Sequence, residues 1–305
     1  MPFLKTAELD MHYETGGHGK EVLLLLHGNF ASWRWWQPIL KNTPRGYRAV
    51  APDLRGCGDT DQPEEGYSIA QHVEDVDQLI GTLRLKRFHL VGHSLGGCVA
   101  LEYALGNPRR IKTLTLVAPA PAEGRSVVNS SGYSNGFTNC SSTMHSAFRM
   151  SERFGTHRKV MERALSRMMT PDRIDGDFDT LVDDAVRMSR NAAVGHIETL
   201  NAWDVQDAIG RLNLPVLIIG GRNDHLIPVE ALKKAAEKFP QGRLIVWPGM
   251  GHAPQLEQPE RFNQILLKFT RQHPAATVTK LRKHICRFFH NMSAAQLQDS
   301  YQLCD

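Results

Sequence analysis

The pentapeptide Gly-His-Ser-Leu-Gly at residues 92–96 constrains the fold of this chain more than any other feature. It follows an apolar run over 88–91 and precedes a segment with a helical pattern over 98–104. Small residues on both sides of a serine let the backbone turn sharply from a strand into a helix, with the serine Oγ at the tip of the turn. The pattern therefore predicts a strand, a tight turn and a helix, with Ser94 as the candidate nucleophile.

Two later segments supply the groups that would activate a serine, because its hydroxyl is a poor nucleophile at neutral pH until a base removes the proton. An apolar run over 215–219 predicts a buried strand, and the loop after it presents Asp224 as an orienting carboxylate. A strand-like run over 243–247 is followed by a loop that presents His252 as a general base. We expect both side chains to form a catalytic triad with Ser94.

An oxyanion hole is predicted after the apolar run over 22–26, where a His-Gly pair is followed by Asn29. Backbone N–H groups placed before the reaction begins are the usual donors to a tetrahedral intermediate. We assign the first donor to Asn29, through its main chain or its side-chain amide, with Phe30 as the alternative. The second donor is the N–H of Leu95, the residue after the nucleophile.

Four motifs in order make the chain similar to the α/β-hydrolase fold superfamily. They are the His-Gly pair at 27–28, the loop over 52–58, the serine turn, and Asp224 together with the Gly-His pair at 251–252. The similarity covers roughly residues 3–272 and is to the cap-bearing serine esterases, lactonases and haloperoxidase-like enzymes that use no cofactor. It implies an α/β fold with a mostly parallel, twisted, eight-stranded sheet flanked by helices and a helical cap inserted after the sixth strand.

The resemblance also implies an activity, the hydrolysis of small carboxylic esters or lactones through an acyl-enzyme. Haloalkane dehalogenases and epoxide hydrolases use an aspartate as nucleophile where this chain has Ser94, and this difference argues against both activities. A carbon-carbon bond hydrolase, an acyltransferase with the same triad, and a ligand receptor without turnover stay open. We expect no cofactor, and no metal site because the histidines and cysteines lack the spacing of ligand pairs. Glu123 is the alternative triad acid.

The chain divides into four segments by pattern. Residues 1–121 and 209–272 alternate strand-like and helix-like runs and form the hydrolase core. Between them, over 122–208, the strand signal disappears, which predicts the helical cap. Six of the ten methionines lie in this cap, where they either line a lid over apolar substrates or pack the cap helices together. The segment 273–305 has the pattern of a basic amphipathic helix, which would touch a membrane surface, a second subunit or its own domain.

Four residues near the serine and the oxyanion loop are candidates for the substrate pocket. They are Phe30, Trp33, Trp36 and His93. The tryptophans follow the oxyanion loop closely, so one of them is expected to wall the acyl pocket, although packing in the core is the plainer interpretation. An aspartate and an arginine in the loop over 52–58 are expected to pair and to tie loops beside the active site.

Composition limits the class of partner. The 305 residues contain 36 basic and 32 acidic side chains, so a nucleic acid has little electrostatic attraction, and a small-molecule substrate is expected. The cysteine count is five, and an odd count suits a reducing compartment better than a disulfide framework. The N-terminus lacks a secretion signal and no apolar run has the length of a membrane span, so we expect a cytoplasmic protein, with a homodimer left open.

Overall fold

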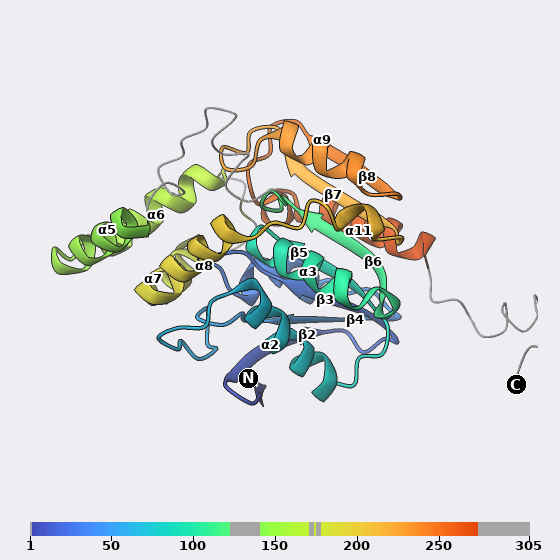
Figure 1. Ribbon diagram of the computed structural model, residues 1–305, viewed down its shortest axis with the longest axis horizontal. Coiled ribbons are helices and arrows are strands. Elements are labelled where there is room, and N and C mark those ends of the chain that lie inside the picture. Colours follow the sequence, from blue (N-terminus) through green and yellow to red (C-terminus); the bar gives the residue numbers. More distant parts are fainter. Residues whose placement is uncertain (1, 123–140, 171–173, 175–177, 274–305) are drawn as a thin grey trace, which may run out of the picture.

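An eight-stranded sheet forms the centre of the protein, in the order β1-β2-β4-β3-β5-β6-β7-β8 (Figure 1). The computed structural model describes residues 2–122, 141–170, 174 and 178–273, with only the backbone of 141–144. The strands are β1 (Phe3–Lys5), β2 (Asp10–Gly16), β3 (Glu21–Leu26), β4 (Tyr47–Pro52), β5 (Phe88–His93), β6 (Ile111–Val117), β7 (Val216–Gly221) and β8 (Gly242–Trp247). Strand β2 pairs antiparallel with both β1 and β4. The remaining pairs, from β4 across to β8, are parallel. The mostly parallel sheet predicted for this chain is confirmed.

Helices cover both faces of the sheet, and the strands are apolar on both faces for that reason. In β3, Leu24 and Leu26 pack in the cluster that contains α2 and α3, whereas Leu23 and Leu25 pack with α1 and α11. The core helices are α1 (Gln37–Lys41), α2 (Ile69–Thr82), α3 (Leu95–Gly106), α9 (Val229–Lys238), α10 (Pro254–Glu257) and α11 (Pro259–Gln272). Short 3-10 turns are η1 (Trp33–Trp36), η2 (Pro108–Arg110) and η4 (Ile209–Arg211). Among the described residues, no helix is both long and apolar enough to cross a membrane.

The cap consists of the helices between β6 and β7, and Figure 1 shows them gathered at one end of the sheet. They are α5 (Ser141–Arg153), α6 (His157–Met168), α7 (Phe178–Arg187) and α8 (Arg190–Ala202). The predicted helical insertion after the sixth strand is thus confirmed. Met161, Met169 and Met188 are buried in the cluster that joins cap and core, whereas Met150 is 57% exposed. The cap methionines therefore divide between packing and surface positions.

A buried carboxylate fastens the cap to the core. Asp184 of α7 is 3% exposed and accepts hydrogen bonds from Arg34 Nη1 (2.9 Å), from Arg187 Nη2 (2.6 Å) and from the hydroxyl of Ser32. Arg187 also donates to Asp59 of the core (2.8 Å). Because Ser32 and Arg34 belong to the core, both sides of the interface share one buried anion, which is costly to bury unless it is paired in this way.

The loop over 52–58 pairs differently from the prediction. Asp53 accepts from Trp33 N (2.7 Å) and from His12 Nδ1 (2.8 Å), so its two oxygens are already occupied. Arg55, 2% exposed, instead reaches α2, where its Nε and Nη2 each donate to Asp75 at 2.8 Å. The expected pair between Asp53 and Arg55 is therefore wrong, because each residue has a better placed partner.

Candidate active site

Ser94 occupies a strained turn between β5 and α3. Its backbone has φ 50° and ψ −116°, a conformation that non-glycine residues rarely adopt. The turn needs small neighbours: a Cβ added to Gly92 would lie 2.2 Å from Gly96 O, and one added to Gly96 would lie 2.3 Å from His27 O. The Ser94 N–H donates to Val117 O on β6 (3.0 Å), which holds the turn against the sheet. This crowding explains the spacing of the pentapeptide.

Asp224 and His252 meet beyond the ends of β7 and β8. His252 Nδ1 donates to Asp224 Oδ2 at 2.8 Å, and both side chains are completely buried. The other carboxylate oxygen of Asp224 accepts from Leu226 N (2.8 Å) and Ile227 N (3.0 Å). With the proton on Nδ1, the lone pair of a neutral His252 is on Nε2, the atom that would accept a proton.

The serine turn packs against His252 through His93, and no hydrogen bond joins Ser94 to His252. Within the described part of the chain, His252 Nε2 has no hydrogen-bond partner. The next residue to Ser94, His93, contacts His252 directly: the ring centroids are 4.8 Å apart and His93 Nε2 donates to His252 O at 2.9 Å. Catalytic hydrogen bonds are often longer in enzymes without substrate and shorten when substrate binds.

The two predicted oxyanion donors belong to segments that meet at the serine turn. Gly28 is close to it, since an added Cβ would be 3.0 Å from Ser94 Cβ. Leu95 is the first residue of α3, so its N–H has no acceptor within the helix. The N–H of Phe30 donates to Asn29 Oδ1 (3.0 Å), which leaves it unsuited to the alternative role that its sequence position allowed. Asn29 and Leu95 stay the predicted donor pair.

The Asn29 side chain is held by its neighbour Phe30 and by a cap histidine. Because the Phe30 N–H can only donate, the atom of Asn29 that faces it must be the oxygen. His196 of α8 contacts the same oxygen through Nδ1 at 2.9 Å, so Nδ1 carries the proton. Both N–H donors of the Asn29 amide consequently point away from these two partners. No pattern in the sequence indicates this contact, because the two residues lie 167 positions apart.

Burial disfavours a positive charge on the two histidines packed around the serine turn. Burial, and then the neighbouring His252, lower the pKa of His93 well below its usual range. Burial also lowers the pKa of His27. His27 Nε2 accepts from Leu54 N (2.9 Å) and Nδ1 donates to Gly28 O (2.8 Å), so this side chain connects the loop over 52–58 to the oxyanion loop.

The four pocket candidates lie in different places. Phe30 is in the cluster shared by core and cap and stacks on Phe148 of α5, with ring centroids 6.1 Å apart. Trp36 is completely buried against Phe262 of α11, which leaves it no surface for a ligand. Trp33 is half-buried beneath the guanidinium of Arg34, and His93, 1% exposed, stacks on Trp35. Phe30 is therefore the one member of this set that faces the cap.

Glu257 was not among the residues singled out from sequence. It is 4% exposed, and its carboxylate accepts from the N–H groups of Gly251 (3.0 Å) and Ala253 (3.2 Å), the residues on both sides of His252. The available sequence signal for this contact was its place five residues after the histidine, in a short segment before a proline. Distance along the chain does not show that the side chain folds back.

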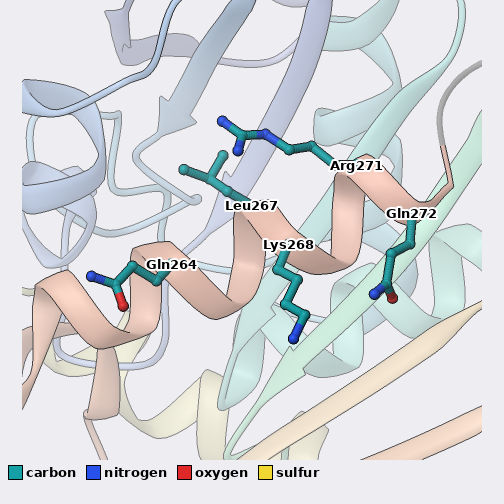
Figure 2. Close-up of a pocket in the computed structure, with 5 residues that line it drawn as sticks. All are labelled: Gln264, Leu267, Lys268, Arg271 and Gln272. Atoms are coloured by element: carbon teal, nitrogen blue, oxygen red, sulfur yellow. The ribbon is translucent and has the colours of Figure 1, made fainter.

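Two other features lie apart from the candidate site. His12, Asp53 and Asp59 place possible metal-ligating atoms within 4.8 Å of one another, but both oxygens of Asp53 already accept hydrogen bonds. A hollow along α11 is lined by five side chains of that one helix (Figure 2), and none of them belongs to the candidate site. The alternative acid Glu123 and the segment 274–305, with its predicted amphipathic helix, lie outside the described residues.

Similarity to known proteins extends over most of the chain. The family described as alpha/beta hydrolase fold matches residues 21–259. A protein of Agrobacterium fabrum (strain C58) provisionally named carbamate hydrolase RutD is 27% identical over 268 residues, which are 85% of this chain and 97% of that protein. The 2-hydroxy-6-oxononadienedioate/2-hydroxy-6-oxononatrienedioate hydrolase of Paraburkholderia phymatum is 28% identical and covers 87% and 92% of the two chains. The enol-lactonase of Burkholderia xenovorans LB400 superposes with a TM-score of 0.73 at 20% identity, over 88% and 99%.

Proposed function

The chain belongs to the α/β-hydrolase fold family, and on that premise we propose that it is a serine hydrolase that cleaves small carboxylic esters or lactones through an acyl-enzyme. One observation carries the proposal. A buried carboxylate and imidazole, Asp224 and His252, are joined by a 2.8 Å hydrogen bond, and the remaining nitrogen of the ring is free beside a strained serine turn. This arrangement matches what a weak hydroxyl nucleophile requires.

The reaction follows from these positions. Ser94 Oγ attacks the ester carbonyl while His252 Nε2 takes the hydroxyl proton, and the carboxylate of Asp224 stabilises the imidazolium. The oxyanion of the tetrahedral intermediate accepts from the N–H groups of Asn29 and Leu95. The intermediate then collapses, the carbon–oxygen bond to the alcohol breaks, and the alcohol leaves with the proton from His252. Water, deprotonated by His252, hydrolyses the acyl-enzyme and restores the serine.

The substitution Ser94→Ala tests the proposal. We expect it to abolish turnover of nitrophenyl esters and labelling by a fluorophosphonate, because both need the hydroxyl. The exposed Ser166 of α6 gives a matched control, and Ser166→Ala should label and hydrolyse as the parent does. Ester hydrolysis that survives in Ser94→Ala would refute the assignment. Tight binding of a ligand by the parent and by Ser94→Ala, with no turnover by either, would favour a receptor instead.

Carbon-carbon bond hydrolysis is the second candidate function. It is favoured by the 28% identity to the oxononadienedioate hydrolase over 92% of that protein's length. The same nucleophile and base would act on a carbonyl whose leaving group is carbon. A panel of nitrophenyl esters, lactones, carbamates and dienoate ring-cleavage products separates the two functions through kcat/KM. Preference for the dienoates would replace the ester proposal, while keeping the roles of Ser94 and His252.

A further inference from the structure

The backbone of His252 is held by residues outside its own loop. Its N–H donates to Met168 O, at the C-terminal end of cap helix α6, at 2.7 Å. Its carbonyl accepts from His93 Nε2 (2.9 Å), and its Nδ1 donates to Asp224. Every hydrogen-bonding group of His252 except Nε2 thus has a partner in the described residues, and one of those partners belongs to the cap.

Glu257 joins the same two parts of the molecule. Its Oε1 accepts from Gly251 N (3.0 Å) and Ala253 N (3.2 Å), and its Oε2 from Gly251 N (3.1 Å) and from Thr170 N of the cap (3.4 Å). Within the described ranges, no lysine, arginine or histidine forms an ion pair with this carboxylate. A buried carboxylate is costly unless hydrogen bonds compensate it, and here the compensation comes from the peptide groups around His252 and from the cap.

Close packing keeps the cap and the histidine loop in contact at this point. A Cβ added to Gly251 would lie 2.6 Å from Met168 O, 3.1 Å from Glu257 Oε1 and 3.3 Å from Met169 Cα. Glycine is therefore the residue that lets the end of α6 lie directly against the loop. We call Met168, Thr170 and Glu257 the cap clasp.

We propose that Glu257 is a positioning residue that, through the cap clasp, sets the geometry of His252 and makes it depend on the docked position of α6. The proposal rests on the proposed function. A carboxylate that only capped α10 would need the N–H of Ala253, the residue that precedes that helix. The hydrogen bonds from Gly251 and Thr170 cap no helix. They restrain the backbone just before His252 and the cap segment just after α6.

The first test replaces the carboxylate. In Glu257→Gln, one acceptor oxygen remains and the amide N–H2 faces backbone donors, so the loop is expected to shift. A misplacement of about 1 Å costs roughly a hundredfold in rate, and we expect kcat on a small nitrophenyl ester to fall by about tenfold to a hundredfold. KM should change by less than about twofold, since uniform substrate binding is untouched. The exposed Glu260 provides the control Glu260→Gln, which should match the parent.

Two further readouts separate positioning from stability. Fluorophosphonate labelling should slow by the same factor as kcat, and the proton resonance of His252 Nδ1–H should shift or broaden. Thermal unfolding is followed on the same samples. A Glu257→Gln protein that keeps the kcat, labelling rate and resonance of the parent overturns the proposal, and so does one that loses only thermal stability. If the parent itself is not labelled, the proposed function fails instead.

The second test addresses the cap directly. Thr170→Pro removes the N–H that donates to Glu257, while Thr170→Ala keeps it and measures the loss of the side chain alone. The position precedes Pro171 in the sequence, which disfavours helical backbone there and suits a proline. Loss of one such bond should lower kcat of Thr170→Pro by about threefold to tenfold relative to Thr170→Ala. Equal kcat values in the two variants would show that the cap does not act through the clasp, even where Glu257→Gln is impaired or unfolded.

Discussion

Asp224→Asn provides a sharp test of the acid, because the surrounding backbone dictates how the new amide must sit. The carboxylate oxygen Oδ1 accepts from Leu226 N (2.8 Å) and Ile227 N (3.0 Å). An asparagine must place its oxygen there, since its N–H2 group would otherwise face two donors. The amide nitrogen then points at His252 Nδ1, which must become an acceptor. The ring proton moves to Nε2, and His252 can no longer take the proton of Ser94.

The size of the effect follows from this change of tautomer. In the serine proteases the same substitution lowers kcat by about 10⁴ with the geometry intact. That factor corresponds to about 5.4 kcal/mol of activation free energy, at about 1.36 kcal/mol for each tenfold. The side chains are nearly equal in volume and the hydrogen bonds to Leu226 and Ile227 survive, so the circular dichroism spectrum should not change. A loss confined to the rate separates the tautomer effect from unfolding.

The assay is initial-rate hydrolysis of a nitrophenyl ester at neutral pH by the parent, by Asp224→Asn and by Asp207→Asn. Asp207 is exposed and controls for loss of a carboxylate charge. We expect the control to match the parent. A kcat of Asp224→Asn within about tenfold of the parent would contradict the reasoning. Attention would then turn to Glu123, the alternative acid named from sequence.

Two predictions concern stability. Burial lowers the pKa of His72 to about 3, whereas its pKa in the unfolded chain is near 6.5. Between these two values the unfolded chain binds a proton that the folded chain does not. The free energy of unfolding therefore falls as the pH drops from about 6.5 toward 3. Neither ring nitrogen of His72 has a hydrogen-bond partner in the described structure, so leucine can replace it without the loss of a hydrogen bond. In urea titrations, His72→Leu should reduce the difference in unfolding free energy between pH 7.5 and pH 5 by about 2 kcal/mol. An unchanged difference would disprove the assignment. Asp75→Ala leaves the buried guanidinium of Arg55 without its main partner and should cost about 3–5 kcal/mol. Glu230→Ala, at a surface pair with a 74% exposed carboxylate, should cost about 1 kcal/mol or less. Equal losses in the two variants would argue against the buried pair.

The fold was predictable because its signals are local. Gly92 and Gly96 surround Ser94 at the spacing that the crowded turn demands, and the apolar runs before and after it specify a strand and a helix. The strand-loop positions of Asp224 and His252 are of the same kind, because parallel strands end at the same edge of the sheet. Their catalytic roles and the domain boundaries stay predictions.

Contacts between the cap and the core were not predictable in this way. Apolar periodicity shows that a helix has a buried face, but it does not show which loop that face covers. The contact of His196 with Asn29 joins residues 167 positions apart, and that of Thr170 with Glu257 joins residues 87 apart. The partner of Arg55 was predicted wrongly for a related reason. Nearness along the chain suggested Asp53, whereas the long side chain reaches Asp75 on α2.

The buried Asp184 limits how freely the cap can be exchanged between proteins of this fold. Its carboxylate belongs to the insertion, yet two of its partners, Ser32 and Arg34, belong to the core and would stay behind if the insertion were moved to another scaffold. A recipient without them would inherit an anion that has lost two of its three partners. Chimeras that exchange lids between relatives should therefore be built with all three positions moved as one unit.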